Sequence, residues 1–66
     1  MTKTELWKVP AGAHFLDAVG ESAVVLLHGY GHTVDGDEIR TARVRTDAGA
    51  EYVLRGDLQV LAGQVH

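Results

Sequence analysis

The chain has 66 residues, which is enough for one small domain and no more. It contains no cysteine, so neither a disulfide framework nor a thiolate metal site can stabilise it. Its formal net charge of −3 disfavours non-specific nucleic-acid binding as the main activity. No apolar run approaches the roughly 20 residues that span a bilayer, and the N-terminus lacks the apolar segment of a secretory signal. We therefore expect a cytoplasmic protein without a membrane partner. A domain this small buries only about 60% of the surface of its unfolded chain, so a second copy or a protein partner would help to stabilise it.

The first half of the chain predicts three short strands separated by turns. The first, Leu6–Val9, ends at Pro10, which cannot donate a ladder hydrogen bond. The second is Ala13–Val19. Glycines flank it and leave about two helical turns, too few for an independent helix, so a strand is favoured. The third, Ala23–Leu27, is the most apolar stretch in the chain.

The strand Ala23–Leu27 is apolar on both of its faces. Either Val25 and Leu27 or Val24 and Leu26 can point into the core, and the alternation of side chains does not distinguish the two. A strand that is apolar on both faces must be central or covered on its outer face. We take Val24 and Leu26 as candidate protein-contact residues on that outer face.

A glycine-rich segment, Gly29–Asp37, follows and predicts a loop of nine residues. Most connections in compact domains have about 4–6 residues, and longer loops often carry function. Tyr30 lies between two glycines, so we expect it to be exposed. Rigid exposed aromatic side chains are common contact residues in interfaces, and we assign Tyr30 and His32 to a protein-binding site.

The C-terminal third predicts a β-hairpin. Two runs rich in β-forming residues flank Asp47-Ala48-Gly49, which is a turn signal. A tight corner at Arg55-Gly56-Asp57 leads to a short closing strand, Leu58–Leu61, and residues 62–66 are expected to fray. The residues of this region that we expect in the core are Val44, Tyr52, Leu54, Leu58 and Val60. Of the aromatic residues elsewhere, we expect Trp7 and Phe15 to be buried.

Three arginines form a possible binding stripe on the hairpin. Arg43 and Arg45 share one strand face, and Arg55 is expected across from them. Such a stripe could follow the phosphates of a nucleic acid or dock an anionic protein. The alternative is a solvated face on which the arginines pair with Glu51 and Asp47.

His28, His32 and Asp35 form the only candidate metal site. Imidazole and carboxylate together suit zinc or another divalent first-row ion. The two histidines have a metal-ligand spacing only on a helix, and the glycines beside them argue against one. The alternative is a solvated acidic loop, and we expect no cofactor.

Catalysis is not expected. The segment Val24–Gly31 resembles the strand and His-Gly turn that precede the oxyanion hole of α/β-hydrolases. That fold also needs a Gly-x-Ser-x-Gly elbow, and the only serine, Ser22, lies upstream in a different context.

The run Val44–Leu54, followed by Asp57–Leu61, resembles the end of an SH3-like barrel of the bacterial SH3, Tudor or KOW kind. The resemblance implies an all-β fold, a small five- to six-stranded barrel with the glycine-rich loop at residues 29–37. It covers about the last 25 residues and lacks the basic surroundings of KOW domains. We therefore expect a non-catalytic protein-binding or assembly module formed by residues 1–66. The alternative is a nucleic-acid-binding barrel.

Overall fold

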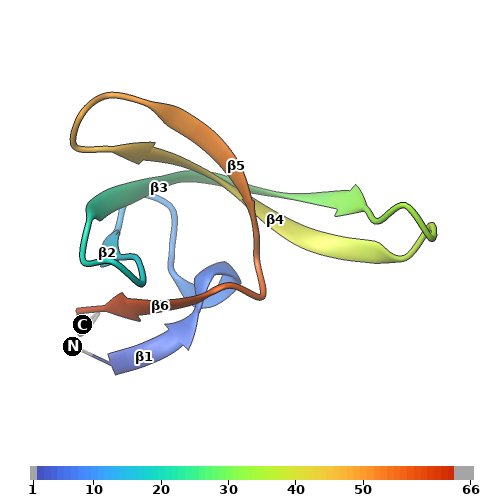
Figure 1. Ribbon diagram of the computed structural model, residues 1–66, viewed down its shortest axis with the longest axis horizontal. Coiled ribbons are helices and arrows are strands. Elements are labelled where there is room, and N and C mark those ends of the chain that lie inside the picture. The colour runs from blue at the N-terminus through green and yellow to red at the C-terminus, as the bar shows by residue number, and fades with distance from the viewer. Residues whose placement is uncertain (1, 64–66) are drawn as a thin grey trace.

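A computed structural model describes residues 2–63, which form a single antiparallel sheet (Figure 1). The prediction of an all-β fold is confirmed, since a single 3₁₀ turn, η1, is the only helical element in this range. The elements in chain order are β1 (Thr2–Glu5), η1 (Leu6–Lys8), β2 (His14–Leu16), β3 (Ser22–His32), β4 (Glu38–Thr46), β5 (Glu51–Arg55) and β6 (Gln59–Ala62).

The sheet is bent but not closed. The strand order is β1-β6-β2-β3-β4-β5, so β1 and β5 are its two edges (Figure 1). Closure into a barrel would need these two edge strands to pair with each other. Among residues 2–63, β1 pairs only with β6 and β5 only with β4. The predicted closed barrel is therefore not confirmed.

The predicted C-terminal hairpin is confirmed. β4 and β5 pair from Thr41 with Arg55 to Arg45 with Glu51. The turn between them places Gly49 at a φ of 91°, a conformation that glycine adopts without a Cβ clash. At the predicted corner, the Leu58 N–H donates to the Arg55 carbonyl at 3.3 Å, and the chain then enters β6.

The predicted loop at residues 29–37 is wrong in its first half. β3 continues through these glycines to His32, and it pairs with β4 in a ribbon that extends away from the body (Figure 1). Gly29 and Gly31 lie against Thr41, where an added Cβ would be 3.3 Å from that side chain. Glycine here allows close packing across the ribbon rather than a turn. The loop is only residues 33–37.

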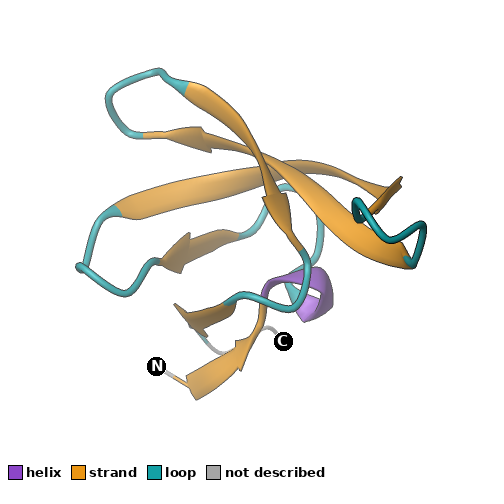
Figure 2. Ribbon diagram, turned by 45° about the vertical axis from the view of Figure 1, so that its right-hand side comes forward, coloured by secondary structure: helices purple, strands orange, loops and turns teal. Residues whose placement is uncertain are grey.

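The predicted first strand, Leu6–Val9, is also wrong. The extended segment is β1, and the chain then turns through η1, which lies beside the β5–β6 corner (Figure 2). This turn buries Leu6 and Val9 together, because residues three apart share a face of a 3₁₀ turn. The second strand shortens to β2 because Asp17 begins a turn, in which its carboxylate accepts from the Val19 and Glu21 amides.

The core lies on the inner face of the bent sheet. Its buried members are Leu6, Val9, Phe15, Ala23, Val25, Ala42, Val44, Val60 and Ala62. Val44, Val60 and Phe15 were predicted, and Leu54 packs against the cluster while partly buried. Tyr52 and Leu58 were wrongly placed in the core, since they are 54% and 40% exposed. Tyr52 points to the inner face, but from an edge strand that no further strand covers.

A β-bulge decides which side of β3 faces the core. Val25 is opposite Val44 and buried, whereas Leu27 is opposite Arg43 and 54% exposed. Leu26, between them, has no partner in β4. Neither of the two alternations expected from the sequence therefore holds along the whole strand, because a bulge shifts the pairing by one residue.

At the C-terminal end, β6 includes Ala62, which is buried, so the strand continues one residue into the segment expected to fray. Residues 64–66 lie outside the described part of the chain. Between residues 2 and 63 there is no helix long and apolar enough to cross a membrane.

Candidate functional site

The most distinctive surface lies where η1 meets the base of the β3–β4 ribbon. Trp7, in η1, is held there through its backbone, since its N–H donates to the Gly56 carbonyl at 2.9 Å. Its indole Nε1–H donates to Glu5 Oε2 at 3.1 Å. The ring is thus fixed in both position and orientation, although it is only partly buried.

Gly56 allows three segments to meet at this point. Its own N–H donates to the Arg40 carbonyl at 2.7 Å, which ties the β5–β6 corner to β4. A Cβ on this residue would lie 2.9 Å from the Trp7 Cβ and 3.0 Å from both the Cβ and the carbonyl oxygen of Arg40. No side chain fits in that space without moving backbone.

Arg40 stacks on the Trp7 ring. Its guanidinium carbon is 4.3 Å from the ring centroid, and the Lys8 ammonium is 5.2 Å from it. A cation over an indole face gains about 0.5–1 kcal/mol at an exposed site. Lys8 also pairs with Glu5 at 3.7 Å. Among the described residues, no carboxylate lies within ion-pair distance of Arg40, which makes it unlike the other three arginines.

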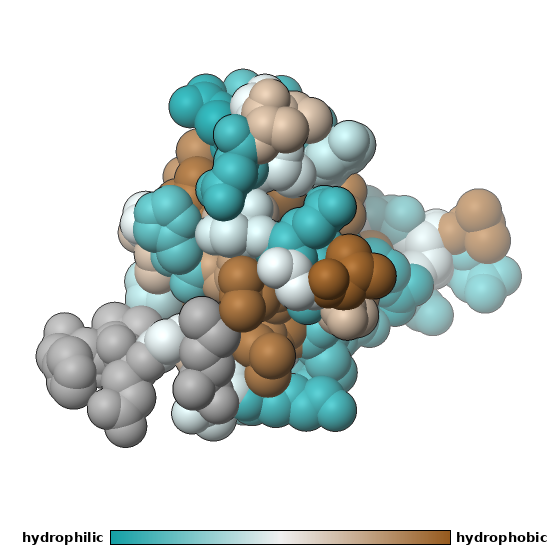
Figure 3. Space-filling model, turned by 60° about the vertical axis from the view of Figure 1, so that its left-hand side comes forward, coloured by the Kyte–Doolittle hydropathy of each residue, from teal (hydrophilic) through white to brown (hydrophobic). Residues whose placement is uncertain are grey.

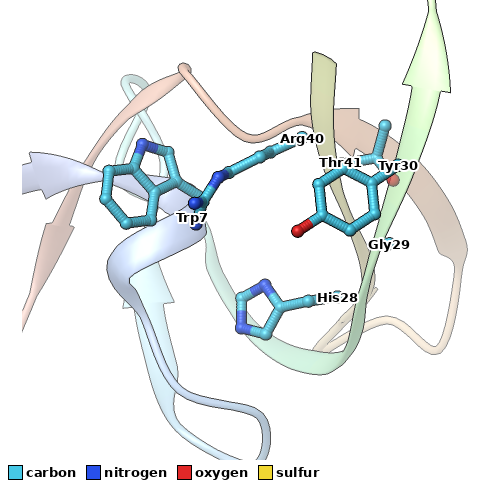
Figure 4. A pocket seen from close by; sticks show the side chains of 6 residues that line it. All are labelled: Trp7, His28, Gly29, Tyr30, Arg40 and Thr41. Atoms are coloured by element: carbon cyan, nitrogen blue, oxygen red, sulfur yellow. The ribbon is translucent and has the colours of Figure 1, made fainter. Parts of the chain in front are cut away.

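Two β3 side chains complete what we call the Trp7–Arg40 corner. Tyr30 is opposite Arg40 in the β3–β4 register, and His28 is two residues before it on the same face. Figure 4 shows Trp7, Arg40, Tyr30 and His28 around a shallow depression of about 280 Å³. Tyr30 is 69% exposed, as the sequence predicted, but it belongs to a strand rather than to a loop. His32 lies further along the ribbon on the same side.

The arginine stripe exists, but it is largely paired. Arg43 and Arg45 lie on the outer face of β4, where Glu51 accepts from Arg43 Nε at 3.2 Å and from an Arg45 terminal nitrogen at 3.1 Å. These hydrogen bonds, Arg45 first and then Arg43, lower the pKa of Glu51. Arg55 instead pairs with Asp57 at 3.0 Å. This is the solvated alternative named from the sequence, with Asp57 in place of Asp47.

The outer face of β3 also carries apolar side chains. Val24 is opposite Arg45 and partly buried, and Leu26 is partly buried within the bulge. Leu27 and Val53 flank Arg43 in one cross-strand row. Figure 3 shows apolar side chains gathered on one face of the molecule. Val60 and Leu61 of β6 line a separate depression with Lys3 and Asp17.

The candidate metal ligands do not come together. His28 and His32 are four residues apart on an extended strand, which separates them by about 13 Å. Asp35 lies in the turn beyond the end of the ribbon. Among residues 2–63, no group of three or more histidine, aspartate or glutamate side chains is placed to hold a metal ion.

Sequence reasoning missed Trp7 and Arg40 as a pair. It placed Trp7 in the core and left Arg40 outside the arginine stripe. One signal was present: Arg40 alternates with Ala42 and Val44, so it points to the inner side of β4. A cation on the core-facing side of a strand needs a specific partner, and an aromatic face is one such partner.

Comparison with protein-family models, curated proteins and solved structures finds no match for the chain.

Proposed function

We propose that the protein is a non-catalytic protein-binding module whose Trp7–Arg40 corner binds a carboxylate-bearing segment of a partner protein. The observation that carries this proposal is the state of Arg40. It is exposed and held against Trp7, and among the described residues no carboxylate lies within ion-pair distance of it. Asp57 lines a depression beside Trp7 and Arg40, but it pairs with Arg55. The other three arginines each pair with an acid of this chain.

The chemistry of the corner favours an acidic ligand. Stacking on Trp7 covers one face of the guanidinium and leaves its N–H groups at the rim to donate to an incoming carboxylate. Because Trp7 already restricts the side chain, binding costs less conformational entropy than it does for a free arginine. Tyr30 adds an exposed aromatic surface beside the cation, the kind of residue that contributes strongly to interfaces.

A nucleic-acid partner is the alternative. Arg40, Trp7 and Tyr30 could also stack on the bases of a single strand. However, tracking phosphates needs further free cations, and Arg43, Arg45 and Arg55 already have carboxylate partners. The net charge of −3 also opposes association with a polyanion. The protein partner is therefore the function we favour.

We further infer that the sheet is an open variant of the SH3-like architecture. The β4–β5 hairpin, the tight corner at Gly56 and the short β6 support this inference, and the free edge of β5 marks where it departs from a closed barrel. The proposed binding site does not depend on it, because fold alone does not define function.

Affinity purification of the tagged protein from its own cells, with nuclease present, tests the proposal. Arg40→Gln removes the charge while keeping a side chain of similar length. The matched control is Arg45→Gln, which removes an exposed arginine on the outer face of β4. A hydrogen bond to a charged group is worth about 1.5–3 kcal/mol, so R40Q should weaken binding of the recovered partner by about 10- to 150-fold. R45Q should leave it within about twofold.

Two results would contradict the proposal. A partner that binds R40Q as tightly as the wild type would remove the corner from the interface. Recovery that disappears with nuclease treatment would instead favour the nucleic-acid alternative. Tyr30→Ala supplies an independent test. It removes an exposed aromatic ring from the corner without changing its charge, so it should also weaken binding of the recovered partner.

A further inference from the structure

The edge of the sheet at β5 has the features of a strand that accepts another strand. It forms the upper margin of the molecule in Figure 1, with no strand beyond it. Of its three central side chains, two are exposed, Tyr52 at 54% and Val53 at 61%. Edge strands that must stay unpaired usually carry charged residues, lysine above all, or a proline or a bulge. β5 has no lysine, proline or bulge, and its two charged residues, Glu51 and Arg55, stand only at its ends. The other edge, β1, is polar and includes Lys3.

The hydrogen-bond pattern shows which backbone groups of β5 face the open edge. Gly56 donates to Arg40 and Thr46 donates to Ala50, one beyond each end of the β4–β5 ladder. In an antiparallel pair, alternate residues direct both N–H and C=O toward the same neighbour. The even-numbered residues of β5 therefore bond to β4. The N–H and C=O groups of Glu51 and Val53 and the N–H of Arg55 point away from the sheet. The Arg55 carbonyl already accepts from the Leu58 N–H at 3.3 Å, so one lone pair is left for a further donor.

The sequence of β5, Glu51-Tyr-Val-Leu-Arg55, is self-complementary in the antiparallel direction. We propose that β5 pairs antiparallel with β5 of a second copy of this chain, with Val53 on the two-fold axis. In this register Val53 is opposite Val53 of the second copy, and Glu51 is opposite its Arg55. The Val53 pair exchanges both of its N–H···O bonds. In each outer pair the Arg55 N–H donates to the Glu51 carbonyl of the other copy, and the Glu51 N–H shares the Arg55 carbonyl with the Leu58 N–H.

The side chains agree with this register on both faces of the sheet. On the outer face, the two Val53 side chains meet at the axis, and a carboxylate faces an arginine at each end. Within each copy Glu51 also bonds to Arg43 and Arg45, and Arg55 to Asp57, so each end joins two existing ion pairs into one network of alternating charges. On the inner face, Tyr52 is opposite Leu54 of the second copy. Tyr52 and Leu54 line a depression under β5 together with Phe15 and Val44, so the pairing would continue the apolar face across the axis.

Other registers are less favourable. Shifting the axis to Leu54 would place Glu51 opposite Asp57 of the second copy, which brings like charges together. Shifting it to Tyr52 would place Glu51 opposite Val53 and leave Arg55 beyond the paired segment. The register centred on Val53 gives the longest overlap and the only match of opposite charges. The interface is isologous, as a closed dimer requires.

The proposed contact uses a different surface from the Trp7–Arg40 corner, so either proposal can fail without the other. A single pair of five-residue strands forms a small interface, for which we expect dissociation constants between about 1 µM and 1 mM. The dimer would therefore form only at the upper end of ordinary working concentrations.

The first test uses the unaltered protein. Amide NMR spectra are recorded from about 20 µM to about 1 mM, which covers the range in which such small interfaces dissociate. With increasing concentration, the Glu51, Val53 and Arg55 amides should shift and gain protection from hydrogen exchange. The Tyr52 and Leu54 amides, already bonded to β4, should change less. A protein that stays monomeric over this range by sedimentation would overturn the proposal.

The second test uses the position on the axis. Val53→Lys places two cations opposite each other and beside Arg43 of each copy, so dimerisation should weaken at least tenfold. Val53→Thr, which keeps a β-branched residue, should change it by less than about threefold. Mixing V53K with Val53→Glu should restore association, because the introduced lysine of one copy then faces the introduced glutamate of the other.

Val53 is exposed and its N–H is not part of the β4–β5 ladder, so we expect its substitutions to leave the fold intact. Circular dichroism confirms that each variant is folded before its association is measured. A dimer that V53K leaves unchanged would place the interface elsewhere. A dimer that V53K disrupts but the V53K–V53E mixture does not restore would overturn the register with Val53 on the axis.

Discussion

Gly56→Ala is the sharpest test of how this fold is held together. The added methyl group would lie 2.9 Å from the Trp7 Cβ and 3.0 Å from the Arg40 Cβ and carbonyl oxygen. Two of these atoms are the first carbons of their side chains and the third is backbone, so no rotamer change relieves the contacts. The strain must instead displace η1 or β4, which also disturbs the hydrogen bonds from Gly56 to Arg40 and from Trp7 to Gly56.

The expected cost follows from overpacking and chain entropy. Inserting a methyl group into a closely packed site costs about 1–3 kcal/mol. Alanine also restricts the unfolded chain, which returns about 0.4–1 kcal/mol. Taken at their midpoints, about 2 and about 0.7 kcal/mol, these effects lower the free energy of unfolding of G56A by about 1.3 kcal/mol. For a domain of this size, that corresponds to a fall in Tm of about 5–10 °C.

Trp7 is the only tryptophan, so its fluorescence reports both unfolding and the local change at the corner. Urea unfolding of G56A is compared with that of the wild type and of Gly63→Ala. Gly63 has nothing within 4 Å of an added Cβ and no positive φ, which makes it the matched control. A G56A variant as stable as G63A, with native Trp7 emission, would refute the tight contact among η1, β4 and the β5–β6 corner.

Two further predictions concern the β4–β5 hairpin. Gly49→Ala should destabilise the fold by about 1 kcal/mol, because a residue with a Cβ is strained at a φ of 91°; urea unfolding measures this, and stability equal to that of G63A would contradict it. Glu51 should titrate below 4.5 in a carboxyl NMR experiment, because hydrogen bonds from Arg45 and Arg43 lower its pKa. A carboxylate whose pKa is lower in the folded than in the unfolded chain stabilises the fold at pH values above its unfolded-state pKa. It loses that contribution as the pH falls through its folded-state pKa. The wild type should therefore lose its stability advantage over Glu51→Gln as the pH falls below 4.5. A difference in unfolding free energy that stays constant down to about pH 2–3, the lower limit for carboxyl titration, would contradict the pairing of Glu51 with Arg43 and Arg45.

Several elements could be predicted because their signals are local. The hairpin formed by β4 and β5 follows from β-forming runs around a glycine turn, and Gly49 has the positive φ that such a turn requires. The outward face of β4 followed from simple alternation, which correctly placed Arg43 and Arg45 in solvent. The exposure of Tyr30 was also anticipated. These features depend only on residues close together in the chain.

Local signals failed where glycine served tertiary packing. Gly29 and Gly31 were interpreted as a loop, yet they lie in β3 because Thr41 on the facing strand leaves little room for a side chain. Gly56 was correctly placed at a corner, but its contact with Trp7 and Arg40 joins residues from three distant segments. Composition alone does not separate a glycine that turns the chain from one that allows close approach.

The sequence by itself determined that this protein is a small all-β domain with a C-terminal hairpin, because alternation and turn chemistry act over a few residues. The tertiary structure decided which side of β3 faces inward, since the bulge at Leu26 depends on pairing with β4. It also decided that Arg40 stacks on Trp7 and that β5 remains an open edge. Both depend on where β6 and η1 pack, and that placement is set by contacts between residues tens of positions apart.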